Sequence, residues 1–356
     1  MERHSVRTNL SATLPRSKSW LRRCLRGVRR RLAAIPQAVL LGIGLLFVPY
    51  LTRGGERRLA NAIAWLLCRP LFRWYRYART NVDLAFGDRL SDGEKDRIVR
   101  ESFRSTALVL TDYLWFSRRT RERVARHCEI GDETVRRWVE GDFAGTFVTA
   151  HFGNWELAGL MVASRGRRLW SVYRPLGCAA VSRWMRRFRG RAGQRIIPRE
   201  GAMRGVLRAL RQRDVVALLL DQHVSVTEGA AYLDFFGLPA TFSTAVGTLS
   251  HRLRTPVLVC AAVRDGERDA YVLRTVREFS VEETARTDPL DLTRGIVRAY
   301  EEMIRRHPEQ WVWAYRRWKR WQPGDDPKRF PWYAREDRQA PPFDPAACRL
   351  DAAERE

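Results

Sequence analysis

Cysteine is scarce in this chain, and no two of its cysteines stand close together in the sequence. The six cysteines occupy positions 24, 68, 128, 178, 260 and 348. Structural zinc sites and small disulfide-stabilised domains need cysteines at short, repeated spacings. We therefore expect no disulfide framework, no metal site and a reducing environment that faces the cytosol.

The sequence also lacks the short motifs that mark several large enzyme classes. It has no G-x-x-x-x-G-K-[ST] loop, and no G-x-G-x-x-G, G-x-S-x-G or H-E-x-x-H motif in a suitable context. These patterns accompany nucleotide hydrolysis, dinucleotide binding, serine hydrolase chemistry and zinc proteolysis, respectively. Their absence removes the main reasons to expect a cofactor.

Lysine is nearly absent, although the chain is strongly basic. It occurs only at positions 18, 95, 319 and 328, so arginine supplies almost all of the positive charge. The formal net charge is +25 and the isoelectric point is about 11.0. Such an excess predicts an anionic partner: a nucleic acid, an anionic membrane surface or a phosphorylated substrate. With 45% hydrophobic and 29% charged residues, the 356-residue chain is typical of a globular protein.

The N-terminal part of the chain divides into a basic segment and a hydrophobic one. Residues 1–31 form an arginine-rich tail, and residues 32–80 are predicted to anchor the chain to a membrane. The uncharged stretch 32–52 has the length of a bilayer span, about 20 residues, but prolines interrupt it. Arginines flank it on both sides, so a monotopic or re-entrant anchor satisfies the positive-inside rule best. A single span and a buried core helix are the alternatives. Aromatic residues interleaved with arginines over 59–77 also favour an interfacial segment on anionic lipid.

After residue 87 the pattern alternates between short apolar runs and amphipathic stretches. Strands are expected at 146–150, 169–173, 195–197, 215–220, 232–236, 256–263 and 271–276. Helices are expected at 91–116, from 155, and at 181–188, 200–212, 243–253 and 292–306. This alternation predicts an α/β fold with a mixed sheet flanked by helices. We assign residues 81–322 to one catalytic domain and expect the Pro- and Asp-rich tail 323–356 to be loose.

The run Thr-Ala-His-Phe-Gly-Asn-Trp-Glu carries the first candidate site. It places His151 and Glu156 directly after an apolar strand. On one helix these side chains would point roughly 140° apart, so we place His151 in a turn and Glu156 in the first helical turn. Gly153 supplies a bend and Asn154 an N-cap. A histidine just outside a helix N-terminus is favoured in the neutral form that a general base needs, and a nearby carboxylate can orient it. A coincidental pairing is the alternative.

Two further strands end in polar residues. Tyr173 and Arg174 end one strand, and Asp221 follows the buried strand 215–220. Ligands of open α/β sheets bind at the carboxyl ends of the strands. Arg174 could grip a phosphate or stabilise an oxyanion, and Asp221 could position Arg174 or a substrate hydroxyl. The alternatives are a surface arginine and a turn-capping aspartate.

Aromatic and basic residues are mixed near the end of the predicted domain. In the block 308–319, Arg316 and Arg317 are expected to face phosphate groups of a lipid or an acyl carrier, whereas a nucleic-acid stacking platform is the alternative. The block 235–241 has the apolar wall and the turn that an acyl-chain groove requires, although plain core explains it equally well.

Taken together, these residues resemble the late acyltransferases of lipid A biosynthesis, the lauroyl and myristoyl transferase family. That family also includes phosphatidylinositol mannoside acyltransferases. The likeness runs from about residue 40 to residue 319. It rests on the hydrophobic N-terminus, the segment Arg-Thr-Asn-Val-Asp-Leu-Ala-Phe at 79–86, the His151-x4-Glu156 motif, Tyr-Arg-Pro, the Asp221 block and Pro-Glu-Gln-Trp at 308–311.

The resemblance implies a glycerolipid-acyltransferase-like fold and transfer of a fatty acyl group from a thioester to a glycolipid hydroxyl. The donor would be an acyl carrier protein or acyl-CoA, without a cofactor. His151 would be the general base and Glu156 its orienting partner, with Arg174 and Asp221 also catalytic. Asn154, Tyr173, Arg316 and Arg317 are expected to bind substrate. The enzyme would lie on the inner (cytoplasmic) membrane with its catalytic domain facing the cytoplasm, and nucleic acid would not be its partner.

Two other functions stay open from the sequence. An acyltransferase of this kind could act on a phospholipid or a mannosylated inositol lipid. A basic membrane-binding or nucleic-acid-binding protein without enzymatic activity would also carry many arginines. The latter predicts that replacing His151 leaves function untouched, whereas neutralising the arginine clusters abolishes it.

Overall fold

The computed structural model describes residues 35–175, 178–266 and 268–342. The basic tail expected at 1–31 therefore lies outside the described residues, as does the end of the chain from 343 onward.

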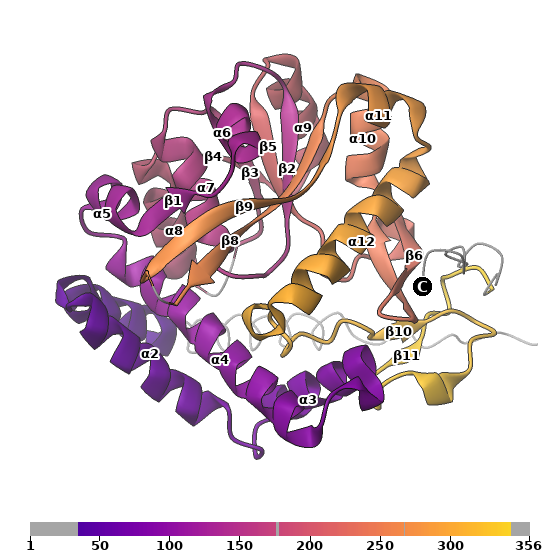
Figure 1. Cartoon of the computed structure of the whole chain (residues 1–356), viewed down its shortest axis with the longest axis horizontal. Coiled ribbons are helices and arrows are strands. Elements are labelled where there is room, and N and C mark those ends of the chain that lie inside the picture. The colour runs from indigo at the N-terminus through magenta and orange to yellow at the C-terminus, as the bar shows by residue number, and fades with distance from the viewer. Residues whose placement is uncertain (1–34, 176–177, 267, 343–356) are drawn as a thin grey trace, which may run out of the picture.

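A seven-stranded mixed sheet forms the centre of the fold (Figure 1). Its strand order is β1-β9-β8-β2-β5-β3-β4, and among these neighbours β8 and β9 pair antiparallel while the others pair parallel. The strands are β1 (Cys128–Ile130), β2 (Gly145–Thr149), β3 (Leu169–Tyr173), β4 (Arg195–Pro198), β5 (Val215–Leu219), β8 (Val257–Asp265) and β9 (Ala270–Phe279). The predicted α/β fold with a mixed sheet is confirmed.

Helices cover both faces of the sheet. Alternate residues of a strand point to opposite faces, so each central strand contributes apolar side chains to both layers. In β8, Val257 and Val259 belong to one core cluster, and Leu258 and Cys260 belong to another. The face of Leu258 is covered by α5 (Thr120–His127), α6 (Glu133–Glu140), α7 (Trp155–Ser164) and α8 (Ala179–Arg191). The opposite face is covered by α9 (Ala202–Arg211), α10 (Ala245–Leu253) and α12 (Pro289–Arg306), with the short α11 (Val281–Arg286) beside α10.

Most of the expected elements have counterparts within a few residues. The expected strand 169–173 coincides with β3. Helix α4 (Asp92–Trp115) begins at a capping box, in which Glu94 N donates to Ser91 Oγ and Ser91 N donates to the Glu94 carboxylate. Strand β1 and helices α5 and α6 were not predicted, because elements of 3 to 8 residues are too short to show a clear period.

Three N-terminal helices pack together at one end of the molecule, at the bottom of Figure 1. Helices α2 (Arg53–Leu67) and α3 (Arg73–Phe86) lie against α4, and the contacts use small residues such as Ala60 and Ala78, which are fully buried. These alanines belong to the same core cluster as the face of Val257. The predicted domain boundary at residue 80 falls inside α3.

The start of the described chain is exposed rather than buried. Residues 35–47 are helical, and Leu40 and Leu46 in this stretch are 71% and 69% exposed. The alternative of a buried core helix is therefore wrong. A single span also lacks support, since none of the helices within the described ranges combines the length and the apolar character needed to cross a membrane.

The C-terminal segment differs from its prediction as a loose tail. Strand β10 (Arg320–Trp321) pairs in parallel with β11 (Arg335–Glu336). Between them the side chains of Phe330 and Tyr333 are 7% and 5% exposed. Residues 323–342 are therefore packed against the fold, because the aromatic residues scattered among the prolines and aspartates supply apolar surface that composition alone underrates.

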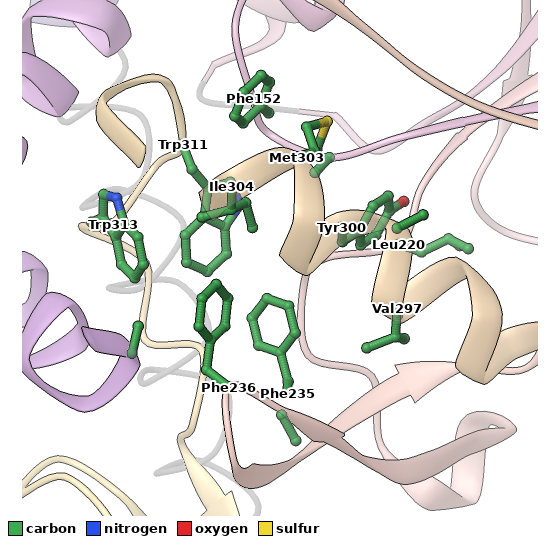
Figure 2. Packing of buried hydrophobic residues seen from close by; sticks show 14 of the residues in the cluster. Phe152, Leu220, Phe235, Phe236, Val297, Tyr300, Met303, Ile304, Trp311 and Trp313 are labelled. Atoms are coloured by element: carbon green, nitrogen blue, oxygen red, sulfur yellow. The ribbon is translucent and has the colours of Figure 1, made fainter. Parts of the chain in front are cut away.

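Of the two alternatives for 235–241, an acyl-chain groove and plain core, the structure shows core. The segment belongs to the hairpin of β6 (Ala230–Phe235) and β7 (Leu238–Ser243), and Phe236 and Gly237 take up the left-handed backbone of its two-residue turn. Figure 2 shows the rings of Phe235 and Phe236 among other buried side chains; the ring of Phe235 lies 5.7 Å from that of Trp311, and the ring of Phe236 lies 6.2 Å from that of Trp313. Short 3₁₀ turns complete the fold: η1 (Val48–Tyr50), η2 (Gly87–Arg89), η3 (Val226–Glu228), η4 (Pro308–Gln310) and η5 (Pro327–Arg329).

Candidate active site

Three neighbouring parallel strands end at one edge of the sheet, and each is followed by a side chain that can carry a charge or transfer a proton. His151 follows β2, Asp221 follows β5 and Arg174 follows β3, and these strands are adjacent in the order β2-β5-β3. Parallel strands present their carboxyl ends at the same edge, which is where α/β sheets bind ligands. The tertiary structure therefore gathers residues that are far apart in the sequence.

His151 and Asp221 form a direct pair. Nδ1 of His151 lies 2.8 Å from Oδ1 of Asp221, and the backbone N–H of His151 donates to Oδ2 at 2.9 Å. Because an ionised carboxylate only accepts, Nδ1 carries the proton and Nε2 keeps its lone pair. The His151 side chain is 26% exposed and that of Asp221 is 4% exposed, so the pair is anchored inside and reachable at the imidazole. This is the geometry of an oriented general base.

The C-terminal block around Trp311 holds this pair in place. Trp311 Nε1 donates to Oδ2 of Asp221 at 3.0 Å. The backbone N–H of Val312 donates to the carbonyl of His151, and that of Gly153 donates to the carbonyl of Gln310. Gly153 has a φ of +55°, and an added Cβ would lie 2.1 Å from the carbonyl oxygen of Ala262, so the bend requires glycine. The loop after β2 is therefore fixed from two sides.

The charges of the pair shift both pKa values. Burial lowers the pKa of His151, but the charge and hydrogen bond of Asp221 outweigh it, and Glu156 adds to the effect, so the pKa lies above its ordinary value. Burial raises the pKa of Asp221, yet His151 and the hydrogen bond from Trp311 bring it below its ordinary value. The expectation that a helix N-terminus favours neutral imidazole is thus overridden by the adjacent carboxylate.

Glu156 does not orient His151 in this structure. Its carboxylate receives two hydrogen bonds from Arg189 of α8, at 2.8 and 2.6 Å, and it is 7% exposed. Asn154 caps α7 as expected, with Leu157 N donating to its Oδ1 at 3.0 Å. Because the helix starts there, Glu156 lies on its first turn and faces α8. The carboxylate that is hydrogen-bonded to His151 belongs to Asp221 and not to Glu156.

Two residues expected to contact substrate are instead buried. The side chain of Asn154 is 1% exposed, and both of its polar atoms bind protein groups. Tyr173 is 5% exposed, and its hydroxyl donates to the carbonyl of Ser182. Both side chains therefore shape the site from behind rather than face into it.

The basic residues near the site divide into exposed and buried ones. Arg174 and Arg316 are exposed, whereas Arg317 is 1% exposed and donates to the carbonyl of Thr241 at 2.6 Å. The guanidinium of Arg317 also stacks over Phe242 at 4.0 Å, and burial lowers its pKa to about 10. Arg317 therefore does not face a phosphate group, contrary to expectation. In the described part of the chain no cluster of His, Cys, Asp and Glu fits a metal ion.

This site lies within a segment that matches a known family. The sequence profile described as bacterial lipid A biosynthesis acyltransferase matches residues 29–320. The chain belongs to this family. It is therefore an acyltransferase, and the alternative of a non-enzymatic binding protein is set aside.

Individual relatives agree with this assignment. Over 258 residues the acyltransferase is 29% identical to the lipid A biosynthesis palmitoleoyltransferase of Escherichia coli (strain K12), covering 71% of this chain and 81% of that protein. A lipid A biosynthesis acyltransferase of Shigella flexneri matches equally well. The lipid A biosynthesis myristoyltransferase of Escherichia coli (strain K12) is 22% identical over 251 residues, covering 70% of this chain and 76% of that protein.

Sequence reasoning missed two residues that shape this acyltransferase site. Trp311 belongs to the aromatic block and to the Pro-Glu-Gln-Trp motif, but neither pattern predicts that its indole N–H binds Asp221. Arg189 was not considered, although it holds Glu156. No local pattern marks either one. The available signal was that an acidic residue following a buried strand needs donors, which only a distant segment could supply.

Proposed function

We propose that this acyltransferase moves a fatty acyl group from an acyl thioester to a hydroxyl of a lipid A precursor, with His151 as general base. The proposal rests above all on the hydrogen-bonded pair of His151 and Asp221 at the carboxyl edge of the sheet. Membership of the lipid A acyltransferase family supports the choice of acceptor. An acyl carrier protein or acyl-CoA would supply the thioester.

The pair is suited to removing one proton during attack. Nε2 of His151 takes the proton from the acceptor hydroxyl as its oxygen bonds to the thioester carbonyl carbon. The carbon–sulfur bond then breaks, and the thiolate receives the proton from His151. Asp221 keeps Nδ1 protonated and stabilises the imidazolium in between. Before substrate binds, Nε2 of His151 lies 3.3 Å from the side-chain nitrogen of the exposed Gln222, so an incoming hydroxyl replaces a weak contact.

Unpaired cations close to this edge would hold the anionic parts of the substrates. Lys319 is half-buried, and burial together with Arg316, Arg320, Arg317 and Arg174 lowers its pKa, so these cations lie close to one another. Among the residues of the three described ranges, none of Arg174, Arg316 and Lys319 has an acidic partner within ion-pair distance. Phosphate groups of a glycolipid or of a phosphopantetheine-type donor would balance this charge.

A small apolar cavity of about 50 Å³ lies near the pair. It lies between the sheet and α7, and its lining includes Thr149, Trp155, Ala158, Gly159 and Leu219. The ring of Trp155 is 5.0 Å from that of His151, so the pocket adjoins the base. Ligand pockets usually measure about 300 Å³ or more, so this cavity is too small to hold an acyl chain.

We also propose that the N-terminal helices rest on the cytoplasmic face of the inner membrane as a monotopic anchor. Large apolar side chains are strongly exposed along residues 35–74. Exposed arginines lie among them, and Arg69 stacks over Trp65 at 3.8 Å. Apolar side chains next to arginines are the composition of a surface that binds anionic lipid.

Polar replacement of this surface is expected to weaken membrane binding. Leu40, Leu46 and Leu71 are 71%, 69% and 88% exposed, so the triple change to serine should leave the fold intact. Each leucine contributes about 1.5 kcal/mol or more when buried in lipid, so we expect co-sedimentation with anionic vesicles to fall at least about tenfold. The double change Met203→Ser and Val281→Ser, at exposed apolar sites elsewhere, is the control. Equal losses in both variants would contradict the anchor.

The reaction itself is tested with defined donors and acceptors. Membranes containing the wild-type protein or His151→Ala would receive acyl-carrier-protein or acyl-CoA donors. The acceptors would be a lipid A precursor, a lysophospholipid and a mannosylated inositol lipid, with products identified by mass spectrometry. Transfer to the lipid A precursor by the wild type alone is expected. Transfer only to another acceptor would overturn the proposed substrate, and equal activity of the variant would overturn the base.

The acid limb of the pH profile should report His151. The base acts only when neutral, and Asp221 raises its pKa above the ordinary value of 6.5, so kcat/KM should fall as the pH drops through an inflection above 6.5. The Asp221→Asn variant loses the negative charge that raises the pKa of His151, whereas the burial that lowers this pKa remains. The inflection of its residual activity should therefore move to lower pH. Measurement of kcat/KM from pH 5.5 to 9 checks this. An unmoved inflection would assign it to another group.

A further inference from the structure

A buried polar cluster connects helix α2 to the catalytic loop. Asp112 of α4 is 1% exposed, and its Oδ2 accepts from Asn154 Nδ2 at 2.9 Å and from the Tyr271 hydroxyl at 2.6 Å. Its other oxygen accepts from Arg53, the first residue of α2, which also binds Glu56 at 2.9 Å. The carboxylate of Asp112 thus has donors from three separate elements, and none of them belongs to the reacting pair.

Burying so many charges has a cost that apolar residues would avoid. Glu56 is fully buried, and burial together with the nearby Asp112 raises its pKa to about 7. Polar groups removed from water are unfavourable unless each has a partner, and replacing one partner alone is strongly destabilising. A cluster of this kind holds the elements that it joins in one fixed arrangement. Because it contacts Asn154, it also fixes the position of the loop that carries His151.

The contact between Asp112 and Asn154 uses the side-chain NH₂ group of Asn154, which the helix cap does not use. Oδ1 of Asn154 accepts from Leu157 N to cap α7, whereas Nδ2 donates to Asp112. The backbone N–H of Asn154 donates to the carbonyl of Ala262 at 3.0 Å. Two residues lie between His151 and Asn154, and one of them, Gly153, forms a left-handed bend. Both side-chain polar atoms and the backbone N–H of Asn154 are therefore hydrogen-bonded to other parts of the fold. These bonds fix the end of the loop that begins at His151.

We propose that Asp112 is a positioning residue for His151, acting through Asn154, and that Arg53 of α2 holds it in place. Among the residues that the structure describes, Arg53 is the one cation within ion-pair distance of Asp112. The inference rests on the proposed role of His151 as base. A displacement of about 1 Å at a general base can lower turnover by roughly a hundredfold, so a loosened loop affects kcat more than KM.

Exchanging the two partners tests the inference in the full-length protein. Asn154→Asp keeps an oxygen for the cap but sets two carboxylates against each other, and Asp112→Asn leaves an amide facing the donors Tyr271 and Arg53. Each single variant should lower kcat at least about tenfold, with KM for either substrate within about threefold of wild type. The double variant Asp112→Asn/Asn154→Asp restores the bond with reversed polarity, so its kcat should return to within about threefold of wild type.

Tyr271→Phe is the matched control, because it removes one hydrogen bond from the same carboxylate without touching the loop. It should lower the melting temperature and leave kcat within about threefold of wild type. Losses in the double variant equal to the product of the two single losses would overturn the proposal, as would single variants that melt earlier but turn over normally. If the single variants do not fold, the double variant and Tyr271→Phe decide. His151→Ala, assayed in parallel, separates failure of this inference from failure of the proposed base.

Discussion

Replacing His151 by alanine is expected to lower kcat for acyl transfer by roughly a thousandfold, within the range of about 10² to 10⁴ that a general base contributes. Asp221 binds Nδ1 of His151 and leaves the lone pair of Nε2 free, and the His151 side chain is 26% exposed, so this imidazole can take the proton of an incoming hydroxyl. KM for the donor should change little, since the exposed cations proposed to hold its phosphate groups stay in place.

The control for this variant is His223→Ala, at the neighbouring imidazole. His223 binds the Thr241 hydroxyl at 2.9 Å, and burial together with Lys319 and Arg317 lowers its pKa to about 4, so it stays neutral without contacting Asp221. Its loss should reduce kcat far less than the loss of His151. Purified variants in detergent, assayed with one donor at saturation, give the comparison. A larger loss at His223 would move the base to that residue.

The second large effect is expected from Asp221→Asn, which should lower kcat about 10² to 10⁴-fold. An asparagine can donate to Nδ1 of His151, which places the ring proton on Nε2 and removes the lone pair that accepts the substrate proton. In serine proteases the corresponding change costs about 10⁴-fold for this reason. Asparagine has the size of aspartate and can still accept from Trp311, so the melting temperature should change little.

Glu156→Gln is the informative counterpart, because it changes the carboxylate that the sequence motif pairs with His151. Glu156 binds Arg189 through two hydrogen bonds, and both side chains are largely buried. Removing one charge of such a pair typically costs about 3 to 5 kcal/mol of stability. We expect a clear drop in melting temperature and a loss of kcat below about tenfold in the folded fraction. The reverse pattern, with Asp221→Asn active and Glu156→Gln inactive, would restore Glu156 as the orienting residue.

The contrast between these two carboxylates shows where local sequence reasoning stops. The segment Gly153–Asn154 is read correctly from residue types, since a bend that excludes Cβ needs glycine and a helix start favours asparagine. The same segment implies that Glu156 is close to His151, and it is close enough to act on its pKa. Which carboxylate forms the hydrogen bond depends on α8 and β5, which pack there only in the folded chain.

The exposure of neighbouring arginines also depends on the tertiary structure. Arg316 and Arg317 are neighbours with the same chemistry, yet one is exposed and the other is 1% exposed against Phe242. The two arginines lie in a loop with a bend at residue 315 and a turn at 317–318, so the direction of each side chain depends on how this loop crosses the surface beneath it. Composition predicts an anionic partner for the chain as a whole, but it does not say which arginines can reach one.

By itself the sequence determined the α/β class, the positions of most strands and helices, and the three strand ends that carry His151, Arg174 and Asp221. Periodicity, capping and turn preferences are local, so they can be read from neighbouring residues. The tertiary structure alone decided that His151 pairs with Asp221, 70 residues away, and that Trp311 joins them. Pairing across a sheet depends on strand order, and strand order follows from how all the elements bury their apolar faces together.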